Sequence, residues 1–129
     1  VDIYMPDFKF WEPETAQKYA NAPDYREIAQ KAFAEMHRQV GDLKIDCYMR
    51  AQEGLLIRHL VMPGYMAESK QIMKYISSSL SKDSYVNIMD QYRPEFDAFN
   101  FPQIARRVST AEFDEVIEFA KEMGLHRGF

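Results

Sequence analysis

Cysteine is almost missing from this 129-residue sequence, which contains only Cys47. A single thiol cannot close an internal disulfide, and it cannot alone supply the ligands that a zinc site or an iron–sulfur cluster requires. Scarce cysteine is typical of proteins from a reducing compartment, so we expect the protein to be cytoplasmic. We do not expect these residues by themselves to hold a metal centre.

Long apolar runs and an excess of positive charge are also missing. No stretch approaches the roughly 20 apolar residues that a membrane helix needs, and no charged-then-apolar leader opens the chain. The 16 basic and 20 acidic residues give a net charge of −4. Nucleic acids and anionic membranes both require a basic face. We therefore expect neither of them as a partner.

Short metal and phosphate motifs are absent as well. The sequence contains no His-x-x-x-His, no Cys-x-x-Cys and no glycine run that could cradle a phosphate. What is present is the composition of a globular protein, with 47% hydrophobic and 28% charged residues. Because the chain opens with Val1 inside a predicted strand, we expect residues 1–129 to be a single partial domain of a longer polypeptide.

Apolar patterning predicts alternating strands and helices. The predicted strands are 1–5, 55–62 and 85–89, with an extra strand or hairpin arm at 43–47; the predicted helices are 12–19, 24–40, 67–79 and 109–123. Capping-box spacing marks two helix starts, at Asp24 with Glu27 and at Ser109 with Glu112. Strand–helix alternation of this kind predicts an α/β fold with a parallel sheet and right-handed crossovers.

Polar residues follow the ends of the predicted strands, where parallel α/β folds bind their ligands. They are Asp7 and Lys9 after the first strand, and Asp90, Gln91, Tyr92 and Arg93 after the last. These side chains could line one polar cleft. They could equally be turn residues that face water, and the pattern leaves both interpretations open.

Arg58 and His59 interrupt an otherwise apolar strand. A charge in a protein core costs several kcal/mol unless it is paired or reaches a ligand. Neighbouring strand residues face opposite ways, so one of the two must face inward. An arginine that extends to the surface and a hydrogen-bonded core histidine would also explain the pair. The sequence does not decide which residue faces inward.

Three segments together carry a resemblance to a known family: 4–9 (YMPDFK), 54–64 (GLLIRHLVMPG) and 86–94 (VNIMDQYRP). They resemble the C-terminal half of radical S-adenosylmethionine proteins of the pyruvate formate-lyase activating enzyme type, in particular the branch of uncharacterised iron–sulfur homologues. The resemblance implies a partial TIM-like barrel. This chain would supply about three strand–helix units plus an inserted strand or hairpin, and the Cys-x-x-x-Cys-x-x-Cys half would lie outside it.

The resemblance also implies a chemistry for the complete protein. A 4Fe–4S cluster and S-adenosyl-L-methionine would generate a 5′-deoxyadenosyl radical, which abstracts hydrogen from a substrate, making the protein an oxidoreductase. In true activases this substrate is a glycine of a partner enzyme. The chain alone would be inactive. Its partners would be the N-terminal half of the same protein and a glycyl-radical-type or other protein substrate.

Site residues follow from the same alignment. The family's Asp-Leu-Lys segment matches Asp7-Phe8-Lys9, and its Leu-Leu-Pro-Tyr-His strand end aligns with 88–92, where Asp90 replaces the proline and Tyr92 the histidine. The implied cofactor-binding residues are Asp7, Lys9, Arg58, Asp90 and Tyr92, and the implied substrate-side residues are His59, Gln91 and Arg93.

Two other interpretations remain. The chain could be a standalone, non-catalytic half-barrel that binds a small ligand or a protein, and a homodimer could then cover its exposed sheet edge. A phosphate-binding half-barrel would need a glycine-rich loop at a helix start, and only Pro63-Gly64 lies near one.

Overall fold

The computed structural model describes residues 2–94 and 96–129, so Val1 of the first predicted strand lies outside the described residues, as does Glu95. The strands are β1 (Ile3–Tyr4), β2 (Lys44–Ile45), β3 (Ala51–Leu60) and β4 (Tyr85–Met89). The main helices are α1 (Pro13–Ala20), α2 (Tyr25–Val40), α3 (Met66–Tyr75) and α4 (Thr110–Glu122). The bounds of β4 agree with its prediction.

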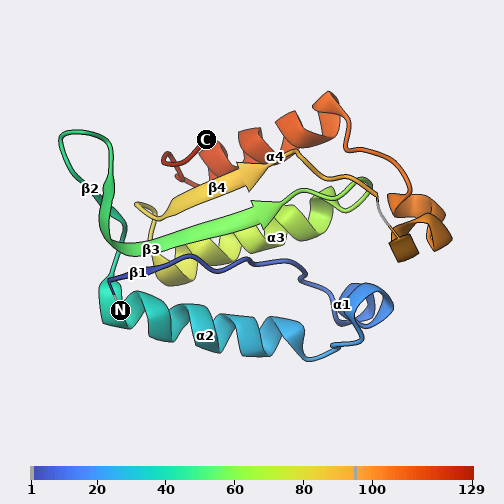
Figure 1. The fold of residues 1–129 in the computed structure, drawn as a ribbon, viewed down its shortest axis with the longest axis horizontal. Helices are drawn as coiled ribbons and strands as arrows, with labels where there is room; N and C mark the ends of the chain where they lie inside the picture. Colours follow the sequence, from blue (N-terminus) through green and yellow to red (C-terminus); the bar gives the residue numbers. More distant parts are fainter. Residues whose placement is uncertain (1, 95) are drawn as a thin grey trace.

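β3 is the central strand of the sheet (Figure 1). It pairs in parallel with β1, where Tyr4 lies beside Leu55, and in parallel with β4, where Leu60 lies beside Met89. β2 pairs antiparallel with the start of β3 and forms the hairpin that protrudes at the N-terminal end of that strand. The predicted α/β class is therefore confirmed, although the sheet is mixed, because β2 runs antiparallel to the three parallel strands.

The helices pack on one face of this sheet. The buried residues Leu55, Ile57 and Val61 of β3 and its end belong to one cluster with residues of α2, α3 and α4. Because every second residue of a strand shares a face, the helices must cover the face that these side chains define. Among the described residues, the opposite face carries only half-buried side chains on the second half of β3, those of Leu56, Arg58 and Leu60.

The structure shows whether the capping boxes predicted at the starts of α2 and α4 form. Ser109 and Glu112 form the predicted capping box, since the Ser109 hydroxyl accepts from the Glu112 N–H and the Glu112 carboxylate accepts from the Ser109 N–H. The capping box predicted at Asp24 is wrong. Asp24 makes no side-chain cap bond, and its backbone at φ −92° and ψ 11° is not the extended conformation that an N-cap usually adopts.

Two predicted segments are more elaborate than expected. The α-helical part of the helix predicted at 67–79 ends at Tyr75, and a π-helical turn, η1 (Ile76–Leu80), forms the rest. The long connection before α4 contains two short 3-10 helices, η2 (Phe96–Asn100) and η3 (Pro102–Ile104), and Phe101 packs edge-on against Tyr19 of α1. No helix in the described part of the chain has the length and apolar character needed to cross a membrane.

Gly54 is required where β3 passes the connection between α2 and β2. Its φ is +116°, and a Cβ there would lie 2.4 Å from the Asp42 carbonyl oxygen. We expect Gly54→Ala to lower the free energy of unfolding by about 3 kcal/mol, because backbone strain and a backbone clash add. Urea denaturation monitored by circular dichroism measures this loss.

Gly41→Ala is the matched control. Gly41 also has a positive φ, +71°, but a Cβ at this position would meet nothing within 4 Å. We expect the substitution to cost about 1–2 kcal/mol, from the backbone conformation alone, since φ 71° with ψ −164° is a region that glycine favours. Equal losses in the two variants would contradict the proposed clash at Gly54.

Candidate functional site

A pocket of about 300 Å³ lies at the ends of β1, β3 and β4. It opens on the face of the sheet that no described helix covers, which we call the open face. It is lined by Asp7, Lys9, Phe10, Arg58, Leu60, Met62 and Met89. The parallel strands bring their carboxyl ends to one edge of the sheet, which places residues distant in sequence side by side. Three of the five predicted cofactor residues, Asp7, Lys9 and Arg58, therefore share this pocket.

Asp7 and Arg58 form the polar centre of the pocket. Backbone bonds fix them side by side, because Phe8 N–H donates to the Arg58 carbonyl and Arg58 N–H donates to the Pro6 carbonyl, both at 2.9 Å. Arg58 Nε lies 3.3 Å from Asp7 Oδ1, with side chains 39% and 37% exposed. An ion pair this exposed contributes at most about 1 kcal/mol. Its main effect is to orient the guanidinium.

Asp7 Oδ1 is buried yet has no hydrogen-bond partner among the described residues, because the approach of Arg58 Nε lacks hydrogen-bond geometry. A buried acceptor without a partner costs roughly 1–3 kcal/mol. An unsatisfied polar atom of this kind needs an explanation, and a water or ligand that supplies the missing donor is one. The pocket thus combines an available acceptor, two cationic groups and an apolar lining.

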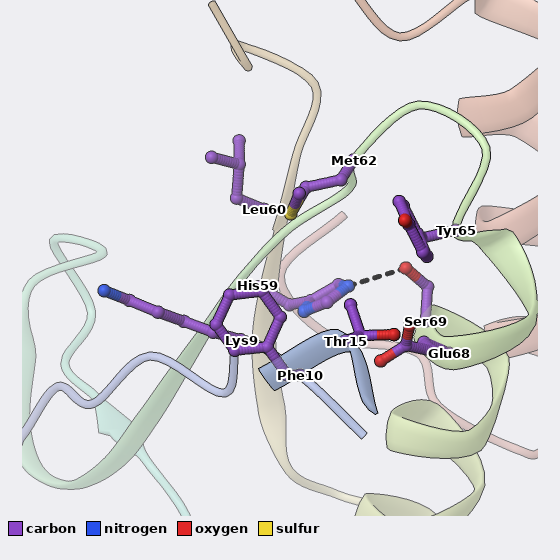
Figure 2. A pocket seen from close by; sticks show the side chains of 9 residues that line it. All are labelled: Lys9, Phe10, Thr15, His59, Leu60, Met62, Tyr65, Glu68 and Ser69. Atoms are coloured by element: carbon purple, nitrogen blue, oxygen red, sulfur yellow. Dashed lines mark hydrogen bonds between the residues drawn. The ribbon is translucent and has the colours of Figure 1, made fainter. Parts of the chain in front are cut away.

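The structure separates Arg58 from His59. Arg58 lies on the open face, whereas His59 is 2% exposed and faces the helices. Figure 2 shows the imidazole directed toward Ser69 of α3, with the Lys9 side chain extending away from it. His59, predicted to lie on the substrate side, is therefore not brought into the pocket that contains Arg58.

His59 instead joins the segment after β1 to α3. Its Nδ1 lies 2.6 Å from the Phe8 carbonyl oxygen, which can only accept, so Nδ1 carries the hydrogen. Nε2 then accepts from the Ser69 hydroxyl at 2.7 Å. Burial lowers the pKa of His59, which favours this neutral form. The bond to Phe8 fixes the backbone between the two pocket residues Asp7 and Lys9.

Glu68 holds the same segment from a second side. Its carboxylate accepts from Trp11 N–H at 2.8 Å and from Glu12 N–H at 3.0 Å, and the residue is 8% exposed. Sequence reasoning missed both Glu68 and Ser69. The available signal was the helical spacing that places Ser69 on the same face of α3 as Ile72 and Met73.

The Ser69 hydroxyl and His59 have the hydrogen-bonding arrangement of a nucleophile and its base. Both residues are 2% exposed, and the hollow beside them has a volume of about 10 Å³ (Figure 2). That volume holds about one water molecule and no substrate. The pair is therefore a structural link.

A second hollow of about 210 Å³ follows the end of β4 and contains the other predicted residues. It is lined by Asp90, Gln91, Tyr92, Arg93 and Arg107. The Tyr92 hydroxyl donates to the Ile104 carbonyl at 2.8 Å, and burial raises the pKa of Tyr92. Tyr92 therefore holds the connection before α4 in place. Arg107 also lines this hollow, and sequence reasoning had not identified it.

Cys47 lies apart from both hollows. It is exposed in the turn between β2 and β3, at the N-terminal end of β3, whereas Arg58 lies near the C-terminal end of that strand. In the described residues, no group of three or more histidine, cysteine, aspartate and glutamate side chains is placed to hold a metal ion.

Comparisons with known proteins find a longer relative. A protein of Methanocaldococcus jannaschii, described as uncharacterized, is 32% identical to this chain over 126 residues. The match covers 97% of this chain and 33% of the relative, so the chain spans about a third of the length of the curated relative it matches. No family model matches the sequence, and no solved structure matches it.

Burial of His59 predicts a pH-dependent stability. The unfolded histidine takes up a proton near its ordinary pKa of 6.5, whereas the folded one resists protonation because its pKa is lowered. The unfolded state then binds more protons, so stability is lost as the pH falls below about 6.5, by up to about 1.4 kcal/mol per pH unit. Urea denaturation between pH 7.5 and 5 measures this loss.

His59→Gln should flatten this part of the pH profile, although it lowers stability at neutral pH. His126→Gln is the matched control, because His126 is an exposed histidine paired with Asp83 and its replacement should leave the slope below pH 6.5 in place. A slope that persists in His59→Gln would contradict the assignment.

Proposed function

We propose that this chain is the C-terminal part of a radical S-adenosylmethionine enzyme of the pyruvate formate-lyase activating type. The observation that carries the proposal is the pocket on the open face, which brings together Asp7, Lys9 and Arg58, the residues that the family resemblance implies for cofactor binding. In this proposal the complete protein is a cytoplasmic oxidoreductase that produces a 5′-deoxyadenosyl radical, and the chain alone is inactive.

The winding of the sheet supports this proposal. Three parallel strands follow one another across the sheet as β1, β3 and β4, and their helices pack on one face. A doubly wound sheet carries helices on both faces, whereas a barrel segment carries them on the outer face alone. The chain would then be about three units of a TIM-like barrel, with the β2 hairpin inserted and the open face directed inward.

The outer edge of β1 favours a further barrel unit, N-terminal to this chain, that pairs with β1. β1 pairs with β3 on one side, and no other described strand pairs with it. Beside it lies an apolar groove of about 290 Å³, lined in part by Pro6, Ile28 and Met36. We propose that the N-terminal half of the same protein covers this edge and groove. The greater length of the archaeal relative is compatible with such a half.

The 4Fe–4S cluster does not fit this chain alone. The chain contains one cysteine, exposed at the opposite end of β3 from the pocket, so the three thiolates would have to come from the other half. The pocket does suit the cofactor's nucleoside part. Asp7 offers a carboxylate acceptor for hydroxyl groups, and Leu60 and Met62 offer apolar surface for a flat base.

When bound, S-adenosylmethionine supplies the 5′-deoxyadenosyl group, and this chain's residues orient it. Arg58 and Lys9 contribute positive charge, and Leu60, Met62 and Met89 contribute apolar surface beside them. Gln91 and Arg93, in the hollow beyond β4, face the substrate in this proposal, which is a glycyl-radical-type or other protein. His59 acts through Phe8 as a positioning residue.

A second candidate is a non-catalytic half-barrel that binds a small ligand or protein and dimerises across the β1 edge. Its support is the exposure of Met5 (58%) and Ile28 (59%) beside that edge. Size-exclusion chromatography with light scattering distinguishes the two. A stable dimer favours the module, and self-association without a defined size favours a chain that has lost its partner half.

The coding sequence upstream of residue 1 provides the simplest test. The proposal expects a Cys-x-x-x-Cys-x-x-Cys motif within about 150 residues, judged from the size of barrel units. A translation start at residue 1, shown by mass spectrometry of the native protein, would refute it.

Substitution of the pocket residues tests the cofactor assignment in the complete protein. We expect Asp7→Ala and Arg58→Ala to reduce reductive cleavage of S-adenosylmethionine at least tenfold, since each removes a charge-assisted contact worth roughly 1.5–3 kcal/mol. Chromatography of 5′-deoxyadenosine measures cleavage, and the visible absorption of the cluster measures its assembly.

Arg38→Ala is the matched control, because Arg38 is an exposed arginine paired with Glu35 on α2. It should cleave the cofactor at the normal rate. Normal cleavage in both pocket variants, with the cluster intact, would remove Asp7 and Arg58 from the cofactor site.

A further inference from the structure

Asn87 occupies an unusual place in β4. It is half-buried in the middle of the strand, between Val86 and Ile88, whose side chains are 0% and 5% exposed on the helix side. By strand alternation, the Asn87 side chain lies on the open face. Asparagine is depleted in strands, because its short polar side chain favours turns and caps. Folding alone therefore does not account for an asparagine at this position.

Strand register sets Asn87 beside the polar centre of the pocket. Asp7 is the bridge partner of Arg58 on one side, and Asn87 is the register partner of Arg58 on the other. Laterally paired residues of parallel strands share a face. Asp7, Arg58 and Asn87 thus form one polar row across three strands of the open face.

Arg58 and Asn87 both retain hydrogen-bond donors that no described residue uses. Arg58 turns its Nε toward Asp7, which leaves the four N–H groups of its two terminal nitrogens. In the described part of the chain, neither these nitrogens nor the Asn87 amide makes a side-chain hydrogen bond. A guanidinium and an amide N–H₂ at paired positions of neighbouring strands are both hydrogen-bond donors, and a carboxylate can accept from both.

Asp7 already contacts the same guanidinium, with its Oδ1 3.3 Å from Arg58 Nε, so an anion has to bind at the two terminal nitrogens of Arg58. The Asp7 and Asn87 backbones lie two strands apart, about 10 Å. Arg58 lies between them and is the nearer charge. Leu60 and Met89, the next pair along the same two strands, continue the face as an apolar surface.

We propose that Arg58 and Asn87 form a recognition site for the carboxylate of a ligand whose apolar part lies against Leu60 and Met89. Asn87 is the residue that determines specificity, because its amide adds a directed donor to the arginine's charge. The site goes beyond the proposed function, since it belongs to this chain and requires neither the cluster nor S-adenosylmethionine.

Nuclear magnetic resonance titration of the complete, ¹⁵N-labelled polypeptide tests the site. The probes are benzoate, benzamide and phenylphosphonate, which share a ring and differ in the polar group, at constant ionic strength. The readouts are the Arg58 Nε–H and Asn87 side-chain amide signals. We expect saturable shifts with benzoate, and binding at least tenfold weaker with benzamide.

Three variants complete the test, with the Arg58 signal as readout and the amide spectrum as a check of folding. Asn87→Leu and Asn87→Asp should each weaken benzoate binding about tenfold or more, the first by removing a hydrogen bond to a charged group and the second by repulsion. Asn100→Leu, a matched change at an exposed asparagine of η2, should leave it unchanged.

Benzoate shifts that persist in Asn87→Leu would overturn the role of Asn87, as would equal binding of benzamide. Tighter binding of phenylphosphonate would overturn the assignment to a carboxylate. Each of these results leaves the upstream cysteine motif and the cleavage of S-adenosylmethionine untouched, so failure of the carboxylate site is distinguishable from failure of the proposed function.

Discussion

The alternation of side chains along β3 is the constraint on which the rest of the structure depends. One face of the strand belongs to the core, because it carries Leu55, Ile57 and Val61, which are buried against the helices. Arg58 must then lie on the other face, because strand neighbours point in opposite directions. A charged side chain in a central strand is tolerated here because that face is open. The packing of the core thereby sets the position of the pocket.

His59 links that core to the pocket. It lies on the helix side, yet its bond to the Phe8 carbonyl holds the segment that carries Asp7 and Lys9. Glu68 holds the following residues through two backbone N–H groups. A buried network with satisfied partners of this kind rigidifies its surroundings. The pocket on the open face is therefore supported by polar contacts on the face that the helices cover.

The sequence predicted the local features of this fold better than it predicted the long-range contacts. The alternation of strands and helices was confirmed, as was the capping box at Ser109, because each depends on residues close in sequence. The rule that parallel strands end at one edge favoured one cleft for Asp7, Lys9 and residues 90–93, whereas the structure groups Asp7 and Lys9 with Arg58 and places residues 90–93 in a separate hollow. The cap predicted at Asp24 failed because spacing alone does not fix the backbone angles there.

Other features could not be predicted, for physical reasons. The apolar run around Arg58 and His59 does not alternate, so the sequence held no signal for which of the two faces the core. The bond from His59 to Phe8 joins residues 51 positions apart. Asn87 becomes part of the site only through its register with Arg58, which depends on how two strands align and not on either strand's composition.

Our proposal requires the open face of β1, β3 and β4 to be the inner, cofactor-binding face of a barrel. A crystal structure of the longer polypeptide with S-adenosylhomocysteine tests this requirement most directly. We expect a further strand paired with β1 and the nucleoside in the pocket beside Asp7 and Arg58. A nucleoside bound elsewhere, or helices covering the face that carries Arg58, would contradict the proposal.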